Sequence, residues 1–146
     1  MKWCAAGLVL LVAACGSGNS LNVTSAYATE PSGPNAAVYL DITNKGGTPD
    51  RLVDVAIDGF TTMLHETSIS ADGQATMSQV MGIDISEKSS VALRPGGIHI
   101  MIMDAAGLVD GDELSATFTF EKHPPVTEMI PVVTLDAYLE LIESQQ

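Results

Sequence analysis

The chain has 146 residues, with 18 acidic and 6 basic side chains and a formal net charge of −12. This length suffices for one domain with a single hydrophobic core. The few Lys and Arg residues form no cluster that could neutralise phosphates, so the composition excludes a nucleic-acid partner, and the scattered acidic residues indicate a solvated surface.

Residues 1–20, MKWCAAGLVLLVAACGSGNS, predict a lipoprotein signal peptide followed by a tether. The apolar run from Ala5 to Ala14 is shorter than the roughly 20 residues of a membrane-spanning helix and is typical of a signal-peptide core. The sequence VAACG at 12–16 resembles a bacterial lipobox, in which Cys15 is lipidated and becomes the first residue of the mature chain. Ordinary signal cleavage near Ala14 is the alternative. Both place the mature chain outside the cytoplasm, and lipidation predicts a membrane-anchored protein of the periplasm or cell envelope.

The folded domain is expected to contain no thiol. The two cysteines are Cys4, in the segment that is removed, and Cys15, which carries the lipid. Disulfides, zinc sites with cysteine ligands and blue-copper sites, which need a thiolate, are therefore excluded.

After residue 20, short strand-like runs alternate with turn residues, which predicts an all-β fold of two packed antiparallel sheets, a β-sandwich. This domain is expected to span residues 21–136, and residues 137–146 form a C-terminal tail, either a short helix or a frayed end. The expected strands are 21–28, 36–44, 51–57, 61–69, 75–80, 89–95, 98–103, 113–121 and 127–135.

The strand expected at 98–103 carries an unusual alternation, IHIMIM. In a strand, Ile100 and Ile102 face one side, whereas His99, Met101 and Met103 face the other. Residues i and i+2 lie ~6.6 Å apart, so His99 and Met101 can converge on one ion above the sheet. Met103 lies about 13 Å from His99 along the strand, too far for the same ion.

His65 in MLHET and Met77 in ATMSQ can complete a four-ligand shell with His99 and Met101. A thioether is a soft, neutral donor, poor for Mg²⁺, Ca²⁺ or Zn²⁺ and good for Cu(I). The remaining methionines are expected to fill gaps in the core, and His123, before two prolines, to be an ordinary surface or hydrogen-bonded residue. These core methionines are Met63, Met81, Met103 and Met129.

The spacing of His65, Met77, His99 and Met101, with the flanking sequences LHET and LRPGGIHIMIM, resembles the copper-binding motif of the periplasmic copper chaperones of the PCu(A)C family. The resemblance covers about residues 21 to 135. It implies a cupredoxin-like Greek-key β-sandwich that binds one Cu(I) through these four residues. It also implies delivery to the binuclear copper centre of cytochrome c oxidase. The implied partners are oxidase subunit II or a Sco-type thiol protein. From the lipobox we expect a lipid anchor, and we expect the chain to be a monomer.

Two features depart from that family. Many members have Met directly after the first histidine, where this chain has Glu66, which alternation places on the opposite face from His65. The chain ends in LIESQQ, without a His- and Met-rich extension, so a second role in binding Cu(II) is not expected.

Other functions remain open from the sequence. Copper storage or resistance would use the same ligands as delivery. A metal-free lipoprotein would use the methionines as core, and would bury both His99 and Met101, whereas a metal site leaves them partly accessible. An enzyme is disfavoured because no activated nucleophile or acid–base carboxylate pair is recognisable.

Overall fold

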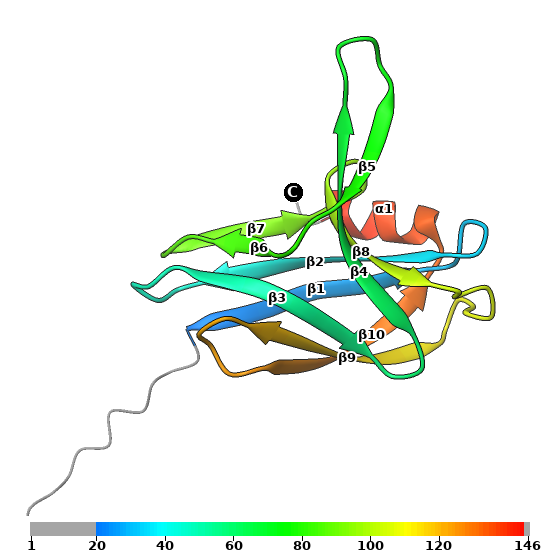
Figure 1. Ribbon diagram of the computed structural model, residues 1–146. Coiled ribbons are helices and arrows are strands. Elements are labelled where there is room, and N and C mark those ends of the chain that lie inside the picture. Colours follow the sequence, from blue (N-terminus) through cyan, green and yellow to red (C-terminus); the bar gives the residue numbers. More distant parts are fainter. Residues whose placement is uncertain (1–19, 145–146) are drawn as a thin grey trace, which may run out of the picture.

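The computed structural model describes residues 20–144, which form ten strands and one helix (Figure 1). The expected strands are all present, and their ends differ from the expected positions by no more than two residues. The one addition is the three-residue strand β6. The elements are β1 (Leu21–Thr29), β2 (Ala36–Asn44), β3 (Asp50–Ile57), β4 (Thr61–Ile69), β5 (Ala75–Gln79), β6 (Ile83–Ile85), β7 (Ser89–Leu93), β8 (Ile98–Met103), β9 (Glu113–Phe120), β10 (Val126–Val133) and α1 (Leu135–Glu143).

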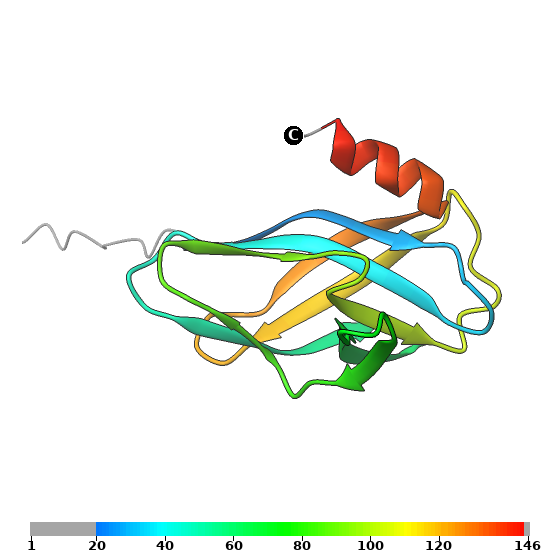
Figure 2. The same cartoon turned by 90° about the horizontal axis from the view of Figure 1, so that it is seen from above.

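The strands fold into two layers, which confirms the predicted β-sandwich. One layer runs β5-β4-β8-β2-β1, with β7 also paired to β2, and the other runs β10-β9-β3-β6. Within each layer the strands pair antiparallel. A short parallel pairing of β1 with β10, Ala28 with Val132 and Thr29 with Val133, joins the layers. Seen from above, the layers lie face to face, with α1 outside them (Figure 2).

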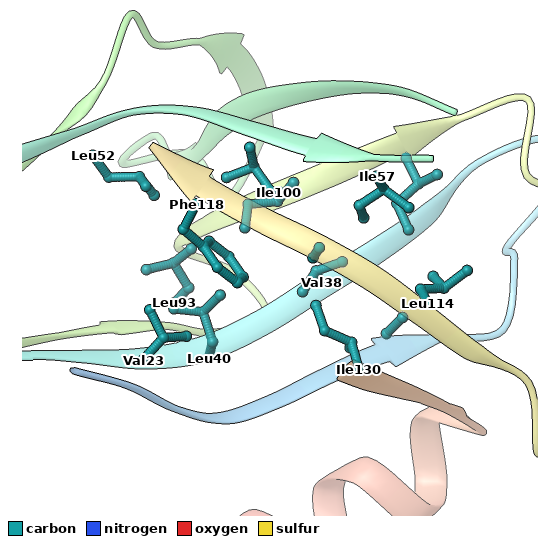
Figure 3. Packing of buried hydrophobic residues seen from close by; sticks show 14 of the residues in the cluster. Val23, Val38, Leu40, Leu52, Ile57, Leu93, Ile100, Leu114, Phe118 and Ile130 are labelled. Carbon is teal, nitrogen blue, oxygen red and sulfur yellow. The ribbon is translucent and has the colours of Figure 1, made fainter. Parts of the chain in front are cut away.

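Alternate apolar side chains from both layers fill the space between them (Figure 3). Phe118 of β9 is fully buried and belongs to the same core cluster as Val38, Leu40 and Ile100 of the opposite layer (Figure 3). The core cluster consists of residues between Leu21 and Val132, so this segment has a complete core of its own.

Helix α1 covers part of the outer face of the β1–β2 layer. Thr134 caps its first turn, because Thr134 Oγ1 accepts a hydrogen bond from the Ala137 N–H at 3.1 Å. Tyr138, fully buried, stacks on Tyr39 with ring centroids 4.9 Å apart and lies 6.1 Å from the Tyr27 ring. The helix therefore begins just before the expected end of the domain at residue 136 and packs on its sheet.

Across residues 20–144, no helix is long and apolar enough to cross a bilayer. The predicted signal peptide, the lipobox and Cys15 lie outside the described residues.

Replacing Ile100 tests whether β8 depends on its core-facing side. Ile100 is fully buried, so Ile100→Ala is expected to lower the free energy of unfolding by about 2–5 kcal/mol. Ile69, on β4, is 68% exposed, so Ile69→Ala serves as the control and should cost less than about 0.5 kcal/mol. Urea unfolding measures both, and equal losses would contradict the assignment of Ile100 to the core.

Candidate metal centre

The antiparallel pairing of β4 with β8 brings histidines and methionines into two adjacent rows. His65 lies directly opposite His99, and Met63 lies opposite Met101. Directly opposed residues project from the same face of a sheet, here the outer face, because the alternate residues Ile100 and Ile102 are buried in the core. The imidazole rings of His65 and His99 have centroids 6.0 Å apart.

A tight turn sets the position and the tautomer of His99. Residues 94–97 form a type II turn, with Gly96 at φ +78° and the Gly97 N–H donating to the Arg94 carbonyl at 3.1 Å. The chain leaves this turn directly into β8, and His99 Nδ1 lies 3.1 Å from the Gly97 carbonyl oxygen. A carbonyl only accepts, so Nδ1 carries the proton and the Nε2 lone pair is left to bind a metal.

His65 has an unsatisfied nitrogen. Its Nδ1 atom is buried and has no hydrogen-bond partner among residues 20–144, which is the situation that metal coordination relieves. Burial, followed by the neighbouring His99, lowers the pKa of His65 below its ordinary value. Neutral imidazole is the form that binds metal, so the environment favours the binding-competent state.

Met77 reaches the site from the β4–β5 hairpin, which projects from the body of the sandwich (Figure 1). It lies opposite Thr67, two residues along β4 from His65, and pairing places both on the face that carries the histidines. Its side chain is 50% exposed. Met77, His99 and Met101 line one cavity of about 330 Å³ on the outer face.

Of the four predicted ligands, His65 does not line that cavity. His65 contacts the His99 ring, and it lies on β4 diagonally across from Met77 of β5. The four predicted ligands therefore come from the adjacent strands β5, β4 and β8.

The electrostatics of the cavity suit a soft cation. Glu30 is the one carboxylate among the described lining residues, and its Oε1 accepts a hydrogen bond from the Asp110 N–H at 3.0 Å. No group of three or more His, Cys, Asp or Glu side chains able to hold a metal occurs within residues 20–144. The donors that lie beside the two imidazoles on this face are thioethers, which bind soft ions better than hard ones.

Two stacked tyrosines, Tyr39 and Tyr138, lie on the side of His99 away from strand β4, and the sequence alone does not predict them. The Tyr39 ring lies 6.4 Å from the His99 ring and 4.9 Å from the Tyr138 ring, and it lines the cavity. Burial raises the pKa of Tyr39, followed by the effect of Tyr138, so its hydroxyl stays neutral. Val38, Tyr39 and Leu40 are consecutive apolar residues, and all three are buried. The sequence therefore shows no apolar–polar alternation here that would have predicted an outward-facing Tyr39.

The expectation that the other methionines fill the core is wrong. None of the methionines in the described segment belongs to the buried core cluster or packs against it. Met81 and Met129 are 81% and 57% exposed, and Met63 and Met103 lie half-buried on the outer face.

From the sequence, His99 and Met101 are expected to be both partly accessible in a metal site and both buried in a core, and the structure shows one of each. Met101 is half-buried and lines the cavity, as a metal site requires. His99 is only 5% exposed, but it also faces the cavity rather than the core. His123 lies elsewhere, with its Nδ1 2.9 Å from the Pro124 carbonyl oxygen.

Comparison with known sequences gives two matches to lipoproteins. The model of the LpqE-like family, described as "Putative lipoprotein LpqE-like", matches residues 21–132. A protein of Leifsonia xyli subsp. xyli, described as "Putative lipoprotein Lxx21020", is 28% identical over 117 residues, which cover 78% of this chain and 70% of that protein.

Solved structures of PCuAC domains are similar in fold. The apo PCuAC domain from PmoF1 has a TM-score of 0.66 and 27% identity, and the match covers 79% of this chain and 94% of that one. CuI-DR1885 from Deinococcus radiodurans has a TM-score of 0.60 and 25% identity, with 79% and 77% covered. The copper-bound PCuAC domain from PmoF2, at 24% identity and a TM-score of 0.64 with 79% and 93% covered, supports the fold alone. These matches confirm the resemblance to the PCu(A)C family and the cupredoxin-like sandwich.

The lowered pKa of His65 predicts a pH dependence of stability. The unfolded chain binds a proton at this residue at a higher pH than the folded chain does. The contribution of His65 to stability is therefore complete above about pH 6.5 and is lost as the pH falls through the folded pKa. Urea unfolding at about pH 7.5 and about pH 5.5 should show a smaller pH effect in His65→Gln than in the wild type. An NMR titration midpoint for His65 at or above about 6.5 would rule this out.

Proposed function

Because this chain belongs to the LpqE-like lipoprotein family, we propose that it is an extracytoplasmic copper chaperone anchored by lipid at Cys15. It binds one Cu(I) through His65, Met77, His99 and Met101. The signal peptide and tether occupy residues 1–20, and the copper-binding domain follows.

The direct pairing of His65 with His99 is the observation that carries this proposal. The two imidazoles, 6.0 Å apart, offer neutral donors on one face. One has its Nδ1 fixed by a backbone carbonyl, and the other has a buried Nδ1 without a partner in the part of the chain that the structure describes. Met77 and Met101 add two neutral sulfurs beside them. Such a set adds no charge, which suits a monovalent soft ion. The similar solved structure of CuI-DR1885 is that of a Cu(I) form.

The unequal exposure of the ligands suggests how copper leaves. Met77 is 50% exposed at the projecting hairpin, whereas His99 is 5% exposed and held by Gly97 and Tyr39. A thiolate of an acceptor can reach the ion from the Met77 side and displace that thioether first. The ion keeps its charge throughout, because one soft donor replaces another and no electron is transferred.

The binuclear copper centre of cytochrome c oxidase is the proposed acceptor, with Sco-type thiol proteins as partners in assembly. Copper storage or resistance is the second candidate, since the same ligands would serve it. The lipid anchor would hold the domain close to a membrane-bound acceptor, which favours delivery.

Competition for Cu(I) against a chromogenic chelator tests the site. The chain from residue 20 onward should bind one equivalent, and His65→Ala and Met77→Leu should each weaken binding by at least about tenfold, since each removes a donor. Met129→Leu makes the same sulfur-to-carbon change on β10, away from the site, and should leave affinity unchanged. Wild-type affinity in both site variants would refute the ligand assignment.

Transfer to an acceptor separates delivery from storage. The Cu(I)-loaded chain is mixed with the copper-free soluble domain of cytochrome c oxidase subunit II, and copper in each protein is measured after separation. Delivery predicts that copper moves to the acceptor when both proteins are present at equal concentration. Retention of copper by the chaperone, with or without a Sco-type protein, would favour storage.

A further inference from the structure

Three methionines lie together on the outer face, one row away from the paired histidines. Met63 of β4 is directly opposite Met101 of β8, and Met103 follows Met101 by two residues on the same face. All three are half-buried. They form a triangle of thioethers, of which the proposed copper site uses one corner, Met101.

Core packing does not account for Met63 and Met103. Neither belongs to the hydrophobic core cluster or to the partly buried residues that pack against it. Two of the residues that flank the three methionines across the sheet are small: Thr61 lies opposite Met103, and Ala37 lies opposite Met101 on the β2 side. Small side chains at these positions leave the sulfurs room to turn toward one another.

The register brings the three sulfurs within reach of one ion. Opposed Cβ atoms such as those of Met63 and Met101 are about 4.5–5.5 Å apart, and the diagonal from Met63 to Met103 is about 7–8 Å. Each sulfur lies two bonds beyond its Cβ atom on a flexible chain, so all three can meet above the centre of the triangle. Three thioethers form a neutral, soft donor set, suited to Cu(I) or Ag(I) and unsuited to Zn²⁺.

We propose that Met63, Met101 and Met103 form a second, thioether-only site for a soft monovalent metal ion. Because Met101 belongs to both sites, an ion can pass between them without leaving the protein. Bonds from Met63 and Met103 form as the bonds from the histidines and Met77 break, and Met101 stays bound. The site stands on the register alone; its role as a relay for copper rests on the proposed function.

Isolating the second site tests it. In the chain from residue 20 onward, His65→Ala/Met77→Leu removes two donors of the first site and leaves the triangle intact. With ¹³C-methyl-labelled methionine, one equivalent of Ag(I) should shift the methyl signals of Met63, Met101 and Met103. The exposed Met129, on β10 in the other layer, is the internal control and should not move. Shifts at Met63 and Met103 no larger than that at Met129 would overturn the proposal.

Leucine substitutions within the triangle give a second measurement. Leucine is close to methionine in volume and is well tolerated, so Met63→Leu and Met103→Leu, added to the isolated-site variant, should keep the fold, which the amide spectrum checks. Together they should weaken Ag(I) binding by at least about tenfold, and unchanged affinity would overturn the proposal. In the wild type, a methyl shift at Met77 reports the first site separately, so failure of the proposed copper site and failure of the triangle can be told apart.

Discussion

The burial of Ile100 and Ile102 is the constraint on which this protein's outer face depends. Both are fully buried, and successive residues of a strand point to opposite faces. Because both isoleucines point into the core, His99, Met101 and Met103 must point to the outer face of the sheet. The register with β4 then decides which residues they lie opposite. A shift of one residue would replace His65 and Met63 by Leu64 and either Thr62 or Glu66, which belong to the other face of β4.

Much of this arrangement was predictable from the sequence, because alternation and turn residues are local signals. The strands, the turn at Gly96 and the outward side of β8 all follow from them. Strand β6 was missed because three residues are too few to show a period. The position of Tyr39 beside His99 depends on the pairing of β2 with β8, which a single sequence does not encode locally. The contact of His99 with Gly97 spans only two residues, but it depends on where the turn points the Gly97 carbonyl, which residue types alone do not show.

The positions of Met63 and Met103 are hard to predict for a related reason. Methionine commonly fills gaps in a core, so residue type alone predicts a core position for both. The register places them beside Met101 instead, outside the core cluster. Met63 directly precedes the core residue Leu64, so alternation around His65 was the signal that could have placed it outward. For polar and sulfur-bearing residues on an alternating strand, the position in the alternation predicts the face of the sheet better than the residue type does.

The half-exposure of Met77 has a further chemical consequence. Outside the cytoplasm, an accessible thioether meets oxidants, and methionine sulfoxide presents a polar group in place of an apolar, soft sulfur. Met77, at 50% exposure, is more open to this reaction than the half-buried Met101. Of the two thioethers in the proposed copper site, the one better placed to release a soft ion is thus also the one more readily oxidised, and an ion bound to its sulfur lone pair would shield it. Loading and resistance to oxidation are therefore linked at a single sulfur atom.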